Sequence, residues 1–220
     1  ALVGGHTGEG RELALGFAVN GLIDPDDVMS KGGLRAGDAL LLTKPIGTGT
    51  LFAAHAKLAA KGRWIDSALA SMMQSNKDAA QCLRRYGSRA CTDVTGFGLL
   101  GHLVEMTRPS GVDAELDLTA IPILPGAEET AAAGILSSLQ PANIRLRRGI
   151  RDQEKWVNHP RYPLIFDPQT AGGLLASVSA DQADACISEL KAMGYPHTAI
   201  IGRVLPQDES GPIEPITLRD

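Results

Sequence analysis

One arrangement recurs three times in this chain and limits the folds that it can adopt. A short, strand-forming run ends in a loop rich in glycine and threonine. The three pairs are Ala39–Thr43 with Lys44–Thr50, Arg89–Cys91 with Thr92–Gly98, and Pro163–Phe166 with Asp167–Gly173. Short, almost wholly apolar runs are typical of strands buried on both faces, and glycine gives the loops freedom to turn. We therefore expect a mixed α/β domain whose strand exits carry its polar chemistry.

The loop after Cys91 concentrates that chemistry. Thr92 and Asp93 place a hydroxyl and a carboxylate at the strand exit, and Gly96 and Gly98 permit a tight turn. An amphipathic helix is predicted next by the apolar residues Leu99, Leu100, Leu103, Val104 and Met106. A helix N-terminus favours phosphate, and a carboxylate is a hard oxygen ligand suited to Mg²⁺. The alternative is that Asp93 only caps the helix.

Two other loops carry groups suited to an anion. In the first, Lys44, Thr48 and the backbone at Gly47 and Gly49 precede an alanine-rich helix predicted over 51–60. The alternative for Thr48 is helix capping. In the second, residues 4–10 form a glycine-rich loop before an apolar run over 13–19, which predicts a doubly buried strand. A plain hairpin turn would also explain that loop.

The remaining segments alternate between helical and strand patterns. Helices are predicted over 64–73, 74–86, 127–133 and 181–193, and strands over 112–118, 174–178 and 199–204. Asn76 is the expected N-cap of the second of these helices. Residues 137–159 are polar and basic and indicate a solvated loop, and the tail from Pro206 onward is expected to be mobile.

Composition narrows the class of protein. The 220 residues carry a net charge of −4 at a pI near 5.7, which gives no support to a nucleic-acid or membrane-surface role. No apolar run approaches the roughly 20 residues of a membrane span, and no signal peptide is visible. The three cysteines, Cys82, Cys91 and Cys186, are widely spaced and indicate packing residues in a reducing compartment. The residues alone therefore predict a domain that binds a phosphorylated ligand with a divalent metal.

Four segments, in order, carry a family signature. They are Gly4–Thr7, Leu41–Gly49, Thr92–His102 and Phe166–Gly173. The chain resembles selenophosphate synthetase (selenide, water dikinase), within the aminoimidazole-ribonucleotide synthetase-like superfamily, from residue 1 to about residue 204. The resemblance implies an α+β fold: a layered mixed sheet with helices, like the C-terminal domain of aminoimidazole-ribonucleotide synthetase, preceded by the last strand of an N-terminal domain.

The resemblance also implies an activity and a set of ligands. The family transfers a phosphoryl group from ATP to selenide with water, giving selenophosphate, AMP and phosphate, and uses Mg²⁺. Asp93 falls on a metal position of the family. Gly4, Gly5, His6 and Thr7 fall on a segment that contacts ATP bound mainly by the partner subunit, so a cytoplasmic homodimer is implied. Lys44, Thr48, Gln169 and Thr170 match family motifs without a defined role.

The chain departs from the family pattern because the N-terminal half, with its reactive Cys or selenocysteine, is absent. We expect residues 1–30 to be a remnant of the N-terminal ATP-binding domain and residues 31–220 to be the C-terminal synthetase-like domain. No catalytic residue is therefore assigned, and the piece alone is expected to be inactive. Two alternatives stay open: a related ATP-dependent kinase or ligase with another acceptor, and a non-catalytic module of a fusion protein.

Overall fold

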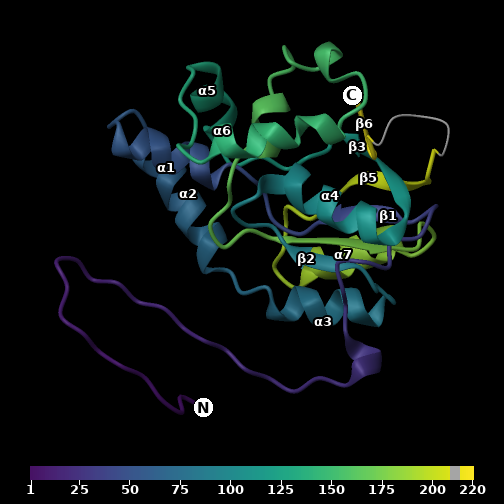
Figure 1. Cartoon of the computed structure of the whole chain (residues 1–220), viewed down its shortest axis with the longest axis horizontal. Helices are drawn as coiled ribbons and strands as arrows, with labels where there is room; N and C mark the ends of the chain where they lie inside the picture. The colour runs from purple at the N-terminus through teal and green to yellow at the C-terminus, as the bar shows by residue number, and fades with distance from the viewer. Residues whose placement is uncertain (209–213) are drawn as a thin grey trace.

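The computed structural model describes residues 1–208 and 214–220, and a six-stranded mixed sheet forms its centre (Figure 1). The strand order is β2-β4-β1-β5-β3-β6. The strands are β1 (Ala39–Leu42), β2 (Cys91–Asp93), β3 (Val112–Asp117), β4 (Leu174–Val178), β5 (Ala199–Pro206) and β6 (Ile216–Arg219). Neighbouring strands are antiparallel except for the parallel pair β3–β6. The α+β mixed sheet predicted from the sequence is confirmed.

Helices cover both faces of the sheet, which explains why its central strand β1 is apolar throughout. Leu40 and Leu42 of β1 pack into a core with α1 (Thr48–Ala56), α2 (Gly62–Met73), α4 (Gly98–Ser110) and α5 (Ala127–Ala132). Ala39 and Leu41 pack into a second core with α3 (Lys77–Arg85) and α7 (Ala183–Ala192). Since successive side chains of a strand point to opposite faces, both faces of β1 need apolar residues.

The strands and helices predicted around these cores are confirmed, with boundaries that differ by a few residues. Asn76 does precede α3, but its side chain makes no capping hydrogen bond. Its Nδ2 instead donates to the Gly172 carbonyl oxygen at 2.9 Å. The residue therefore ties the start of α3 to the 167–173 loop.

The strand predicted over 163–166 is wrong. Residues Tyr162–Phe166 form the 3-10 helix η4, with Leu164, Ile165 and Phe166 fully buried. Proline has no N–H for a sheet ladder, whereas it is tolerated in the first turn of a helix, where Pro163 lies. A short apolar run cannot by itself distinguish a buried strand from a buried helical turn.

Two expectations about loops are also wrong. Within the stretch 137–159 the chain forms α6 (Gln140–Asn143) and the 3-10 helices η2 (Ile144–Gly149) and η3 (Gln153–Lys155), with Gln140 and Asn143 buried. The tail predicted to be mobile contains β6, which pairs with β3 and therefore belongs to the sheet. Part of that tail, residues 209–213, lies outside the described residues.

The segment before η1 (Pro25–Asp27) has no regular structure, so the strand predicted over 13–19 is wrong. Residues 1–23 run as a long excursion away from the sheet and its helices (Figure 1). Leu13 and Val19 are 99% and 90% exposed. An apolar run becomes a strand only where a neighbouring strand accepts its hydrogen bonds, and the described residues offer this segment none. No helix among the described residues is long and apolar enough to cross a membrane.

Candidate functional site

The candidate site lies where β2 ends and α4 begins. β2 pairs with β4, so that Asp93 lies opposite Leu174. The next residue, Val94, is buried and donates its N–H to the Gly173 carbonyl oxygen at 2.8 Å. The Asp93 side chain is exposed, and its carboxylate has no hydrogen bond or ion pair with the described part of the chain. The structure thus holds the backbone of Asp93 firmly and leaves its carboxylate oxygens free.

The loop after Asp93 is packed directly against the 167–173 loop. The Thr95 carbonyl oxygen accepts the N–H groups of Gln169 at 2.9 Å and of Gly98 at 3.1 Å. A Cβ on Gly172 would lie 2.2 Å from the Val94 carbonyl oxygen, so only glycine allows the two loops to come this close. The two polar blocks that the sequence analysis singled out are therefore one structural unit.

His102, in the second turn of α4, also holds the loop after Asp93 in place. Its Nε2 accepts the Thr95 N–H at 3.0 Å, and its ring lies 5.6 Å from that of Phe97, centroid to centroid. Burial lowers the pKa of His102, while the carboxylate of Glu105, 3.5 Å from Nδ1, opposes that shift. The neutral imidazole that results can accept the backbone hydrogen bond, which an imidazolium could not.

The start of α1 was expected to hold an external anion, and the structure corrects that expectation. The Gln169 Oε1 accepts the N–H groups of Gly47 and Thr48 at 2.9 and 3.1 Å, and the Thr48 hydroxyl at 3.1 Å. The Asp167 carboxylate accepts the Thr50 hydroxyl at 2.8 Å. Because these donors already have partners within the chain, the helix N-terminus is not free for a ligand.

Lys44 is likewise used internally. It is 2% exposed, and its Nζ donates to the carbonyl oxygens of Ser71, Gln74 and Ala171 at 3.2, 2.7 and 3.1 Å. Burial lowers the pKa of this lysine. Lys44 therefore joins the C-terminal end of α2 to the 167–173 loop, and it does not face a phosphate.

Asn143 is a site residue that sequence reasoning missed. Its Nδ2 donates to the carbonyl oxygens of Gly96 at 2.8 Å and of Phe166 at 3.1 Å. It lies in the stretch that was predicted to be a solvated loop, and no periodicity or motif marks it as buried. A lone amide that satisfies backbone carbonyls leaves no pattern in a single sequence.

The other predicted site residues lie in the N-terminal excursion. Gly4, Gly5, His6 and Thr7 are exposed, and a Cβ on Gly4 or Gly5 would meet nothing within 4 Å. The structure therefore does not bring them to Asp93. The described residues contain no cluster of three or more His, Cys, Asp or Glu side chains that could hold a metal. A single free carboxylate still fits Mg²⁺, which is commonly bound through one or two carboxylates together with phosphates and water.

The fold and the sequence both have known relatives. A structure of the hydrogenase maturation protein HypE matches with a TM-score of 0.63 at 20% identity, over 90% of this chain and 53% of that one. The thiamine-monophosphate kinase from Stenotrophomonas maltophilia matches with a TM-score of 0.61 at 16% identity, over 89% of this chain and 54% of that one. At these identities the likeness shows the fold alone.

Curated relatives are more similar in sequence to this chain than those solved structures are, and they share the name selenide, water dikinase. "Selenide, water dikinase 2" of Peptoclostridium acidaminophilum is 39% identical over 94% of this chain and 60% of its own length. "Selenide, water dikinase" of Nitratidesulfovibrio vulgaris is 42% identical over 89% of this chain and 56% of its own length. The chain thus spans about 60% of the curated relatives that it matches. The family described as "AIR synthase related protein, C-terminal domain" matches residues 35–213 of this chain, and the chain belongs to this family.

Proposed function

We propose that this chain is the C-terminal part of an ATP-dependent selenophosphate synthetase. The reaction of the whole enzyme converts ATP, selenide and water to selenophosphate, AMP and phosphate. Support comes from relatives named selenide, water dikinase that are 35–42% identical over about nine-tenths of the chain. A HypE structure of the same fold was determined in complex with ATP, which is consistent with a nucleotide substrate.

The observation that carries the proposal is the free carboxylate of Asp93 at the start of a loop that several hydrogen bonds hold in place. Positioning and electrostatic stabilisation dominate phosphoryl transfer, so a charged ligand has to be held rigidly. Asp93 supplies one oxygen ligand for a Mg²⁺ ion, which when bound would neutralise charge on the phosphates of ATP. Thr95, Gln169, Gly172 and His102 then act by fixing the loop that carries Asp93.

The proposed domain organisation follows the same reasoning. Residues 1–30 are assigned to an ATP-binding domain and residues 31–220 to the C-terminal domain. Gly4, Gly5, His6 and Thr7 are assigned to a contact with ATP held by the partner subunit of a cytoplasmic homodimer. The apolar side chains of Leu13, Phe17 and Val19 in the same N-terminal segment are exposed in this chain. Their exposure supports the assignment, because they would be covered in such an assembly.

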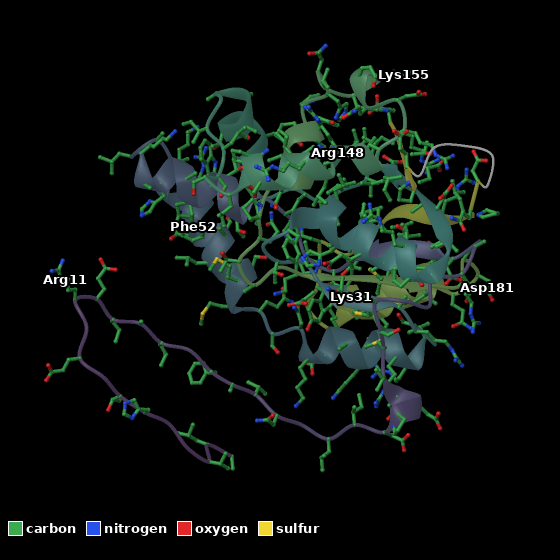
Figure 2. The ribbon with its side chains drawn as sticks, viewed as in Figure 1. Arg11, Lys31, Phe52, Arg148, Lys155 and Asp181 are labelled. Atoms are coloured by element: carbon green, nitrogen blue, oxygen red, sulfur yellow. The ribbon has the colours of Figure 1, made fainter. Side chains whose placement is uncertain are left out.

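The test is phosphorus NMR of the full polypeptide that carries this chain, with Mg-ATP and selenide. We expect a selenophosphate resonance that is lost in Asp93→Asn and retained in Asp181→Asn. Asp181 is exposed, and its carboxylate has no hydrogen bond or ion pair among the described residues. It precedes α7 and lies well away from β2 (Figures 1 and 2). The 220-residue chain alone is expected to form no selenophosphate. ATP consumption without that resonance would instead favour a related kinase or ligase with another acceptor, and no consumption would favour a non-catalytic module.

A further inference from the structure

We propose that the chain has a second anion site, a cavity lined by arginines that binds a small polyvalent oxyanion such as diphosphate. The cavity has a volume of about 310 Å³ and lies between the start of α7, the end of α3 and the turn before β1. That volume is near the lower end of the range for small-molecule sites. This inference does not depend on the proposed selenophosphate chemistry.

The charges around the cavity favour an anion. Arg35, Arg85 and Arg89 line it, against the single carboxylate of Asp38. Arg85 is paired with Glu189, which lies on α7 outside the lining. The guanidinium groups of Arg35 and Arg89 have no ion pair or hydrogen bond among the described residues. Arg35 and Arg89 therefore bring two uncompensated positive charges to one cavity, and an oxyanion bound there would be attracted by both.

Neutral donors complete the lining. Ser179 and Gln182 lie at the N-terminal end of α7, where unpaired backbone N–H groups also favour negative charge. The Ser177 hydroxyl donates to the Asp38 carboxylate at 3.0 Å, so the one acid in the cavity already has a donor. Arginine forks and hydroxyl donors together are suited to the oxygens of a phosphate group.

The rest of the lining argues against a nucleoside. Val178 supplies one aliphatic side chain, and the only aromatic ring is that of Tyr86, whose hydroxyl donates to Glu189 at 3.0 Å. An adjoining hollow shares Arg89 and carries Asp26 and Asp27, with Arg84 paired to Asp27 at 2.8 Å, so its two acids and two arginines offer no net positive charge to the remainder of a larger anion. A base would therefore find little apolar surface, and an inorganic oxyanion fits better.

The cavity lies at the far end of β4 from Asp93. Asp93 pairs with Leu174 at the beginning of that strand, whereas Ser177 to Ser179 are at its end. Five residues of extended chain separate Leu174 from Ser179, which corresponds to about 16 Å. Binding of a ligand in the cavity can therefore be measured separately from binding at Asp93.

The test is isothermal titration calorimetry of the protein with diphosphate and with inorganic phosphate at constant ionic strength. We expect saturable binding of diphosphate that Arg35→Gln/Arg89→Gln weakens by about tenfold or more, since each arginine supplies charge-assisted hydrogen bonds. The matched control is Arg145→Gln/Arg148→Gln, which removes two exposed arginines on η2. The helix η2 packs against the core on the opposite face of the sheet from α3 and α7, where Figure 2 shows Arg148. That control should bind as the parent chain does.

A second variant guards against misfolding of the first. Ser179 is exposed, and its hydroxyl makes no hydrogen bond among the described residues, so Ser179→Asp places a carboxylate in the cavity without removing a contact. This variant should abolish diphosphate binding without lowering the melting temperature. Tighter binding of AMP than of diphosphate, lost in the same variants, would support an anion site but refute its assignment to an inorganic oxyanion. Absence of diphosphate and nucleotide binding at millimolar concentration, or equal binding by cavity and control variants, would overturn the proposal.

Discussion

Gly172→Ala tests whether contact between the two polar loops holds Asp93 in place. A Cβ at this position would lie 2.2 Å from the Val94 carbonyl oxygen, 3.1 Å from the Gln169 Cβ and 3.2 Å from the Val94 carbonyl carbon. One loop must move by about 0.8 Å to open the shortest of these contacts to 3.0 Å. The obstacle is backbone, which cannot rotate away as a side chain can.

The expected loss of stability is about 2–3 kcal/mol, in the upper part of the range for overpacking a tight interior. For a domain of this size that corresponds to a fall in melting temperature of about 4–12 °C. Gly172 does not have a positive φ, so the effect is steric and not one of backbone strain. Thermal unfolding followed by circular dichroism measures it directly.

Gly96→Ala is the matched control. Gly96 lies in the facing loop after Asp93, also without a positive φ, and a Cβ there would meet nothing within 4 Å. Its melting temperature should equal that of the parent or exceed it slightly, because alanine restricts the unfolded chain. Equal melting temperatures for Gly172→Ala and Gly96→Ala would refute the role given to the contact.

Three further predictions concern the buried polar groups. Burial raises the pKa of Asp167 to about 6 from its ordinary 3.8, so the folded state retains a proton between these values and the contribution of Asp167 to the free energy of unfolding should fall by up to about 3 kcal/mol as pH rises from 4 to 7; urea titrations in which Asp167→Asn shows the same pH dependence as the parent would contradict this. Lys44→Met leaves three carbonyl oxygens without their donor and should destabilise the protein by about 2–3 kcal/mol. Lys31→Met, which removes an exposed ion pair with Glu105, should change stability by less than about 1 kcal/mol. Similar losses of stability for the two variants in urea denaturation would count against the burial argument. Burial lowers the pKa of His102, so the contribution of this residue to stability should decline as pH falls below about 6.5, and nitrogen NMR at pH 7 should show a neutral ring protonated on Nδ1; a proton on Nε2 would be inconsistent with the Thr95 hydrogen bond.

The parts of the fold that sequence predicted well are those with a strong local signal. The apolar runs that became β1, β4 and β5 and the periodic segments that became α2 and α7 were recognisable alone. The run at 13–19 is almost wholly apolar, as β1 is, yet it is exposed and unpaired, because strand formation also depends on a partner. The run at 163–166 became η4 because tertiary burial decided between two conformations that the pattern allows equally.

The candidate site was partly predictable for the same reason. Asp93 and its glycines stand together in the sequence, so the loop could be recognised from its residue types. Contacts between distant segments could not be recognised from the sequence, and these contacts decide which polar groups are free to bind a ligand. Lys44 and Thr48 have the chemistry of phosphate ligands, but Ala171 and Gln169, far along the chain, already occupy them. Asn143, which joins two carbonyl oxygens, leaves no signal in one sequence.

The central claim is that Asp93 is a ligand for the metal that accompanies ATP. Electron paramagnetic resonance of Mn²⁺, used in place of Mg²⁺, would count the ions bound by the full polypeptide with a non-hydrolysable ATP analogue. We predict weaker or fewer bound ions in Asp93→Asn and parental binding in Asp181→Asn, because only the first variant loses a carboxylate oxygen at the end of β2. Identical Mn²⁺ binding by the parent protein and Asp93→Asn would contradict the account.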